Sequence, residues 1–190
     1  MDHTKTEHML HHHRRGTMLR GIYPRRQAEG RSEVADCAMT ARAALAVYSR
    51  SPQLAWRQAA ERELDYALTH LCRRGGAFSA REDAAVYPGE NALMIGALAV
   101  GGRVLGKERY LRAAVTARLF LKTRLTDPRG FLYRFWRDGE AVGQAHPDDY
   151  ANYILALTEL YEANGSRFCL REAMHLADQL EARFAGRGER

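Results

Sequence analysis

The sequence predicts an all-α protein built as an array of three helical hairpins, and two observations support this. First, a similar pair of helices recurs three times, with the first helix of each pair containing residues 44–47, 97–100 and 156–159, so the repeats start 53 and 59 residues apart. Second, the first helix of each pair is the more apolar one, and the second carries charge along one side. Repeated units of this length bury their apolar faces on their neighbours. We therefore expect inner helices beneath an outer layer, in an arc of three hairpins where six would close a ring.

Helix starts and ends follow from capping residues. Ser32 is typical of an N-cap, and Pro52 and Pro147 suit an early helical position, where the missing N–H costs little. Gly75–Gly76 and Gly106 are typical of C-terminal ends. The predicted helices cover residues 33–50, 52 to about 75, 89–105, 107–125, 147–163 and 166–185.

The middle hairpin and the loop after it have distinct patterns. The helix at 89–105 is apolar almost all round, which is typical of a helix buried on most sides. The next helix is amphipathic, with four basic residues predicted on its outer side: Arg112, Arg118, Lys122 and Arg124. Asp138–Gly139, flanked by 131–136 and 141–143, predicts a short β-hairpin.

Charge and composition divide the chain in two. The net charge is +6, and seven basic against three acidic residues place +4 of it in residues 1–31. We expect residues 1–31 to form a disordered basic, His-rich arm and residues 32–190 to form one domain. Nucleic-acid binding by the arm is an open but weak alternative, and His11–His13 could hold a transition metal or belong simply to the arm. We predict no metal site and no cofactor.

The cysteines and the hydropathy pattern indicate the compartment. Cys37, Cys72 and Cys169 lie far apart and form no CxxC motif, which favours reduced, buried thiols. No apolar run reaches the roughly 20 residues of a membrane span, and no signal-peptide core is present. We therefore expect a cytoplasmic protein.

Four segments resemble one protein family. They are residues 75–84 (GGAFSAREDA), 90–98 (ENALMIGAL), 134–141 (RFWRDGEA) and 148–151 (DDYA), which occur in the family's order. The family is that of the thioredoxin-domain-containing proteins of the YyaL and spermatogenesis-associated type. The resemblance implies part of a six-hairpin α/α toroid like that of sugar epimerases and some glycosidases. This chain has no CxxC motif, and the resemblance does not extend to a thioredoxin domain, so we expect no redox activity.

Candidate site residues follow from the resemblance, which implies a cleft at the starts of the inner helices. The candidate catalytic residues there are Asp148, Asp149, Glu90 and His146. The candidate ligand-binding residues are Asp83, Asn91, Tyr87, Tyr150, Trp136 and Tyr133. Paired carboxylates allow acid–base chemistry on a sugar, and aromatic rings offer flat apolar surfaces to it. If the chain is an enzyme, the resemblance implies sugar-epimerase-like or glycosidase-like activity.

Each candidate also has a structural interpretation. Asp148, Asp149 and Glu90 occupy first turns of helices, where an acid caps the helix and meets the positive end of its dipole. Asn91 before an apolar run is typical of a structural hydrogen-bond hub, and His146 before Pro147 is typical of a surface loop. Tyr133, Trp136 and Tyr150 suit packing rather than ligand contact.

Two functions remain open at this point. One is a toroid fragment that binds a carbohydrate-like ligand in its inner cleft. The other is a non-catalytic helical interaction or oligomerisation module, because an incomplete ring leaves its end hairpins uncovered. In either case we expect a homo-oligomer, or a partner chain, to complete the ring. We expect no membrane partner.

Overall fold

The computed structural model describes residues 32–184, and these form the three predicted hairpins. The first is α2 (Glu33–Arg50) with α3 (Leu54–Tyr66) and the π-helical turn η2 (Ala67–Leu71). The second is α4 (Pro88–Leu105) with α5 (Glu108–Arg124), and the third is α6 (Pro147–Asn164) with α7 (Arg167–Phe184). The predicted arm, residues 1–31, lies outside the described residues.

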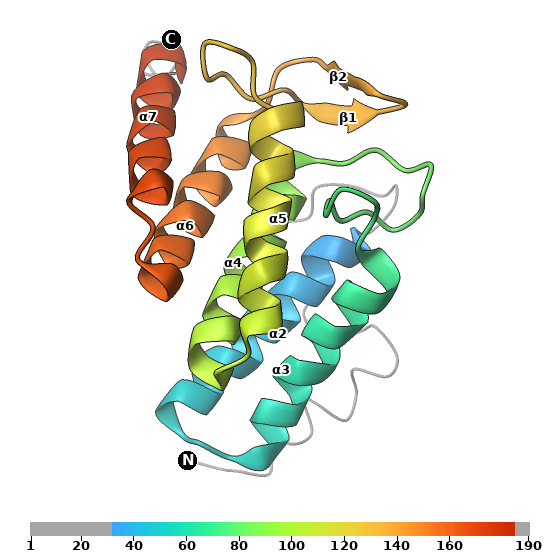
Figure 1. Ribbon diagram of the computed structural model, residues 1–190, viewed down its shortest axis with the longest axis vertical. Helices are drawn as coiled ribbons and strands as arrows, with labels where there is room; N and C mark the ends of the chain where they lie inside the picture. Colours follow the sequence, from blue (N-terminus) through green and yellow to red (C-terminus); the bar gives the residue numbers. More distant parts are fainter. Residues whose placement is uncertain (1–31, 185–190) are drawn as a thin grey trace, which may run out of the picture. The chain divides into compact units, whose positions relative to one another are not determined.

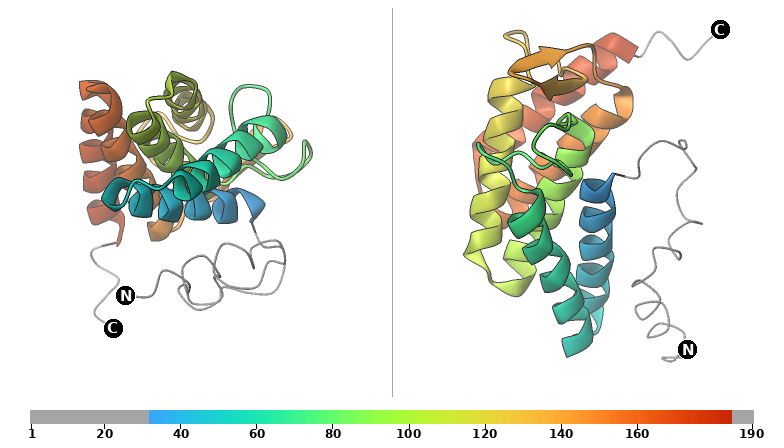
Figure 2. Two further views of the ribbon diagram at one scale, coloured as in Figure 1. Left: turned by 90° about the horizontal axis from the view of Figure 1, so that it is seen from below. Right: turned by 90° about the vertical axis from the view of Figure 1, so that its right-hand side faces the viewer.

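The hairpins stack as two rows of helices, as Figures 1 and 2 show. In the inner row α4 packs against both α2 and α6, while α3, α5 and α7 form the outer row. The inner helices run parallel, so their N-terminal ends all lie on the side of the molecule that carries the β-hairpin. Helix α4 is buried along most of its length, as its all-round apolar sequence predicts. The α/α array of three hairpins is confirmed.

Most helix ends lie where capping residues predict them. The Ser32 hydroxyl accepts a hydrogen bond from the Ala35 backbone N–H at 3.2 Å. Gly106 and Gly165 end α4 and α6 in the left-handed conformation, with φ of 66° and 70°. Among the described residues no helix is long and apolar enough to cross a bilayer.

The end of the second predicted helix was wrong. That helix starts at Leu54 and ends at Leu71, and Cys72 enters an extended conformation after the π-helical turn. Cys72 then bridges to Phe78, and the glycines turn the chain between them with φ of 86° and 89°. A Cβ on Gly76 would clash with Thr116 of α5, so the turn packs against the neighbouring hairpin instead of capping a helix.

The predicted β-hairpin is confirmed but is shorter than its apolar flanks. Strands β1 (Phe135–Arg137) and β2 (Glu140–Val142) pair antiparallel across Asp138–Gly139. Both turn residues have positive φ, 51° and 89°, as the type I′ turn of this dipeptide requires. The preceding residues pair elsewhere, because Leu132 bridges to Thr126.

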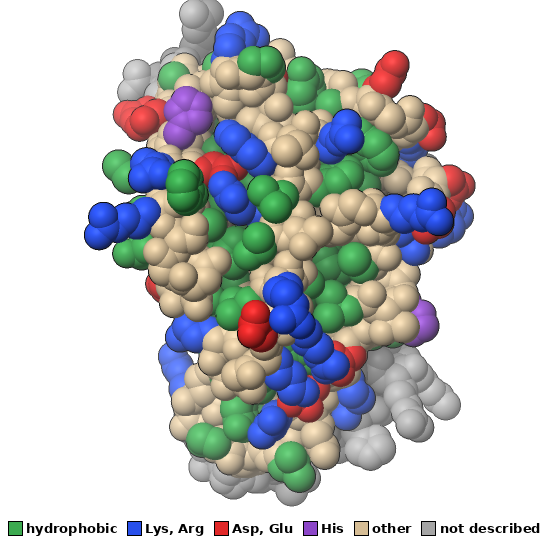
Figure 3. Space-filling model, viewed as in Figure 1, with side chains coloured by type: hydrophobic (Ala, Val, Ile, Leu, Met, Phe, Trp, Pro, Cys, Tyr) green, Lys and Arg blue, Asp and Glu red, His purple; other side chains and the backbone are tan. Residues whose placement is uncertain are grey.

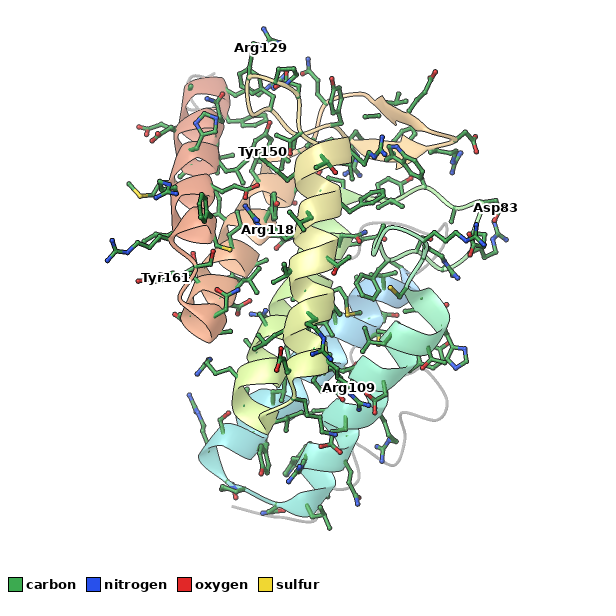
Figure 4. All side chains as sticks on the ribbon, viewed as in Figure 1. Asp83, Arg109, Arg118, Arg129, Tyr150 and Tyr161 are labelled. Carbon is green, nitrogen blue, oxygen red and sulfur yellow. The ribbon has the colours of Figure 1, made fainter. Side chains whose placement is uncertain are left out.

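One basic residue expected outside lies between helices. Arg118 of α5 donates hydrogen bonds to the Glu172 carboxylate of α7, and the Tyr153 hydroxyl of α6 donates to the same carboxylate at 3.1 Å. The Arg118 side chain is 15% exposed, and Figure 4 shows it beside α5 on the side of α6 and α7. The prediction that Arg118 lies outside was wrong because its partner is 54 residues away in the sequence. The other three basic residues of that set are exposed.

Candidate functional site

The first turns of α4 and α6 meet at the N-terminal ends of these helices, under the β-hairpin. Pro88 and Pro147 open these helices at a position where proline is tolerated. The close approach depends on Gly89, because a Cβ there would clash with the Asp149 carboxylate of α6. We call the group Tyr87, Glu90, Arg134 and Asp149 the mouth cluster.

Asp149 is the buried, ion-paired member of the mouth cluster. Its Oδ2 accepts hydrogen bonds from the Arg134 guanidinium and from the His146 backbone N–H, each at 2.8 Å. The residue is 7% exposed. Its carboxylate therefore caps α6, as the structural interpretation expected, and also fixes an arginine that comes from the base of the β-hairpin.

Arg134 connects the two helix starts. Its guanidinium carbon lies 5.2 Å from the centre of the Tyr87 ring, so the cation rests on an aromatic face. Tyr87 is itself the residue before α4, and its ring lies 5.9 Å from that of Phe135. The result is an aromatic and guanidinium surface beside two carboxyl groups.

Glu90 is the titratable member of the mouth cluster. Burial raises the pKa of its carboxyl, the Ser32 hydroxyl and the Arg134 charge oppose the rise in that pKa, and Asp149 adds to it. Glu90 is only half-buried and forms no ion pair among the described residues. A carboxyl with a raised pKa holds its proton to a higher pH than a free carboxyl does, and access to solvent lets it exchange that proton.

Several predicted site residues lie at the edge of the mouth cluster or point away from it. Asp83 is exposed, forms an ion pair with Arg81 at 3.4 Å, and lies at the outer edge of its loop in Figure 4. The side chains of Asp148 and His146 are exposed at the start of α6. Trp136 points the other way and packs edge-on against Phe120 of α5, 5.4 Å between ring centres.

The remaining three predicted residues hold loops. Asn91 is fully buried; its Oδ1 accepts from the Phe78 N–H at 2.7 Å, and its amide donates to the carbonyls of Phe78 and Tyr87. The Tyr150 hydroxyl accepts from the Leu132 N–H at 2.9 Å in the core. Tyr133 is half-buried, and its backbone N–H donates to the Leu125 carbonyl. The structure thus assigns Asn91 and Tyr150 the hub and packing roles that were the alternatives to ligand contact.

Sequence reasoning missed Arg134 and Ser32 as members of this region. Arg134 belongs to the segment 134–141 on which the family resemblance rests, but nothing local shows that it turns back toward Asp149, 15 residues later. Ser32 was recognised only as a cap, although its hydroxyl also opposes the rise in the pKa of Glu90.

The region offers no metal site in the described part of the chain. No group of three or more His, Cys, Asp or Glu side chains within residues 32–184 is placed to hold an ion. At the mouth cluster itself, the Arg134 guanidinium occupies the position beside Asp149 that a cation would need.

Comparison with known sequences finds relatives over about half of the chain. Spermatogenesis-associated protein 20 of Rattus norvegicus is 35% identical over 97 residues, which are 46% of this chain and 12% of the relative. The Homo sapiens protein of the same name is 33% identical over 103 residues, or 50% of this chain and 13% of the relative. The matched segment thus spans about an eighth of these relatives. No protein-family model matches the chain.

Comparison with solved structures shows the fold. The cellobiose 2-epimerase of Spirochaeta thermophila superposes with a TM-score of 0.74 at 15% identity, covering 82% of this chain and 44% of the epimerase. A GH76 α-mannanase of Bacteroides thetaiotaomicron gives 0.69 at 15% identity, with 83% and 46% covered. The Lin0763 protein of Listeria innocua gives 0.73 at 16% identity, with 94% and 51% covered. Together the comparisons confirm a partial match to the thioredoxin-domain-containing proteins of spermatogenesis-associated type, carried on half of an α/α toroid.

Proposed function

We propose that the mouth cluster is a binding site for a carbohydrate-like ligand, in which Glu90 exchanges a proton with the ligand. The observation that carries the proposal is the convergence of Glu90, Asp149 and Arg134 at the starts of two parallel helices. A polyol needs both hydrogen-bond donors and acceptors, and a flat apolar face for its ring. This cluster supplies all three. The printed names of similar folds, an epimerase and a mannanase among them, agree with a sugar.

The residues divide the work by their surroundings. Asp149 is held by two hydrogen bonds and keeps Arg134 in place, so it acts as a positioning residue. Arg134 presents its remaining N–H donors beside the Tyr87 ring, where they can reach ligand hydroxyls. Glu90 is the proton donor or acceptor, because burial raises its pKa. The exposed His146 and Asp148 would touch a ligand from the rim. Epimerase-like or glycosidase-like chemistry is the corresponding reaction class.

Calorimetric titration with cellobiose and mannose at millimolar concentration tests the proposal. We expect measurable heat, and we expect Glu90→Gln and Arg134→Gln each to weaken binding by about tenfold, the loss of one charge-assisted hydrogen bond. Glu108→Gln is the matched control, because Glu108 is an exposed carboxylate at the start of α5, outside the mouth cluster. Absence of heat with both sugars, or equal weakening by the control, would refute the proposal.

A second candidate function is assembly into a closed ring with a second copy of the chain. The observation that favours it is that α2 and α6 each pack against α4 on one side only, while the solved toroids are about twice as long as the region matched. On the uncovered side of α6, Tyr161 is half-exposed and points away from the other inner helices in Figure 4. Two such arcs would cover each other's open sides.

Light scattering of the full chain at low micromolar concentration tests this second candidate. We expect a dimer, and we expect Tyr161→Arg to convert it to a monomer. Leu119→Arg is the control, because Leu119 is 48% exposed on the middle hairpin, away from both open sides. A monomeric native chain would refute the candidate.

A further inference from the structure

A basin of about 480 Å³ lies on the outer face, between α5, the turn before Phe78 and the β-hairpin. It is separate from the mouth cluster, because Trp136 of the hairpin faces α5 whereas Arg134 faces α4 and α6. The residues that line it are Arg74, Gly75, Thr116, Leu119, Phe120, Thr123, Arg124, Trp136 and Gly139. In Figure 3, hydrophobic and basic side chains adjoin on this face over the upper half of α5.

The floor of the basin is aromatic and partly open. Phe120 is 8% exposed and meets the half-buried Trp136 edge-to-face, with ring planes at 84°. Leu119 extends the apolar surface and is 48% exposed. The Trp136 indole N–H has no hydrogen-bond partner within the described part of the chain, so one donor is available beside the apolar floor.

The basin carries positive charge without a counter-charge. Arg74 and Arg124 are exposed, and neither forms an ion pair or a side-chain hydrogen bond with any described residue. No Asp or Glu is among the lining residues. By contrast, Arg42, Arg118 and Arg134 each contact a carboxylate.

Gly75 keeps the basin open. Its φ of +86° is a conformation that side-chain-bearing residues rarely adopt, and a Cβ there would lie 3.4 Å from the Phe120 ring. Any longer side chain at this position would cover the aromatic floor. The turn that sequence reasoning took for a helix end therefore forms one wall of the basin.

We propose that this basin binds a small ring compound that carries a carboxylate. The ring would lie on Phe120 and Trp136, and the carboxylate would pair with Arg74 and Arg124, whose planar guanidinium groups match its geometry. A cation would be repelled, and an uncharged ring would leave both guanidinium groups unpaired. Aryl carboxylates and sugar acids share this chemistry.

The two tryptophans of the chain allow a direct test. Trp56→Phe leaves Trp136 as the sole emitter, and we expect its fluorescence to change on titration with benzoate or glucuronate but not with benzamide or glucose. A response to benzoate alone would identify the ligand as an aryl carboxylate, and a response to glucuronate alone would identify it as a sugar acid. Either result supports the proposal. The indole N–H resonance of Trp136 in the unmodified chain gives a second readout that needs no substitution. No response of either signal to both acids at millimolar concentration would overturn the proposal.

Charge variants separate specific binding from general attraction. Arg74→Gln and Arg124→Gln should each weaken carboxylate binding by about tenfold. Arg62→Gln makes the same charge change on exposed α3 and should leave the affinity unchanged. Glu90→Gln should also leave it unchanged, which distinguishes this site from the mouth cluster. Equal weakening by Arg62→Gln would contradict the proposal.

Discussion

Two of the clusters of arginine, carboxylate and tyrosine in the described residues, one between the second and third hairpins and the other at the mouth, differ in how completely their groups are paired. In the seam between the second and third hairpins, Arg118 and the Tyr153 hydroxyl both donate to Glu172. At the mouth cluster, Arg134 rests on the Tyr87 ring and donates to Asp149, while Glu90 stands beside the pair without an ion-pair partner among the described residues. The same residue types therefore serve two purposes.

Burial explains the contrast. The side chains of Arg118 and Glu172 are 15% and 7% exposed, and burial beside the Glu172 charge raises the pKa of Tyr153 well above its ordinary value. No buried side-chain polar atom of that seam lacks a hydrogen-bond partner, which is typical of a contact that holds hairpins together. The mouth cluster contains one carboxyl more than its arginine pairs with, and that carboxyl keeps access to solvent. A spare, partly desolvated carboxyl is what a chemical site needs and a structural seam does not.

The largest expected effect comes from breaking the seam. Glu172→Ala leaves the buried Arg118 charge unpaired, and we expect the free energy of unfolding to fall by about 3–5 kcal/mol in urea denaturation. Arg118→Met combined with Glu172→Leu should recover most of the loss, because no buried charge remains. The control, Glu108→Ala, removes an exposed pair with Arg112 and should cost less than about 0.5 kcal/mol. A loss below 1 kcal/mol for Glu172→Ala would show that the seam is not structural.

The next largest effect distinguishes two adjacent residues of the first turn of α4, the structural Asn91 and the proposed site residue Glu90. Asn91→Ala removes the side chain that bonds both the N–H and the carbonyl of Phe78, and we expect a loss of about 2–4 kcal/mol because these buried backbone groups lose their partners. Glu90→Gln, one residue earlier, should not lower the stability at neutral pH. Denaturation of both variants checks this. A stable Asn91→Ala protein that fails to bind sugar would contradict the structural role of Asn91.

The sequence predicted what local chemistry controls. Ser32, Gly106 and Pro147 act through their own backbone and neighbours, so most helix ends agree with the structure within two residues. The π-helical turn was missed because it ends the first hairpin at Cys72 through tertiary packing, whereas the glycines three residues later gave the stronger local signal. Arg118 was placed outside because a helix considered alone cannot show a partner on another hairpin.

The site was predicted in part for the same reason. Glu90 and Asp149 were candidates because the family resemblance implies a cleft at the starts of the inner helices, and the first turns of α4 and α6 do meet. Arg134 was missed because its direction depends on the bend before β1. Trp136 was assigned to the same side as the mouth, but side chains alternate along a strand, and that alternation sends Trp136 to α5 while the neighbouring Phe135 ring stays near Tyr87. That signal was present in the sequence.

A smaller effect is expected from the arginine of the mouth cluster. Arg134→Gln should lower the free energy of unfolding by only about 1 kcal/mol, because the Arg134 side chain is 36% exposed and solvent weakens the pair. It should also raise the pKa of Glu90 further, since Arg134 opposes the rise. NMR titration of the Glu90 carboxyl measures that shift. Arg129→Gln, a change at an exposed arginine paired with Asp127, should leave the pKa of Glu90 unaltered.

The smallest effect is a change in the pH dependence of stability. The pKa of Glu90 is raised in the folded state, so between its unfolded and folded pKa values the native protein binds more protons than the unfolded chain. The stabilisation that Glu90 contributes to the free energy of unfolding is therefore fully present below the pKa of the unfolded state. It is lost as the pH rises through the pKa of the folded state. Glu90→Gln should remove this fall, so denaturation curves of variant and native protein should diverge as the pH is raised from about 4, near the ordinary pKa of Glu. Parallel curves would mean that Glu90 is as solvated as an ordinary surface carboxylate, and the distinction between mouth and seam would then rest on Arg134 alone.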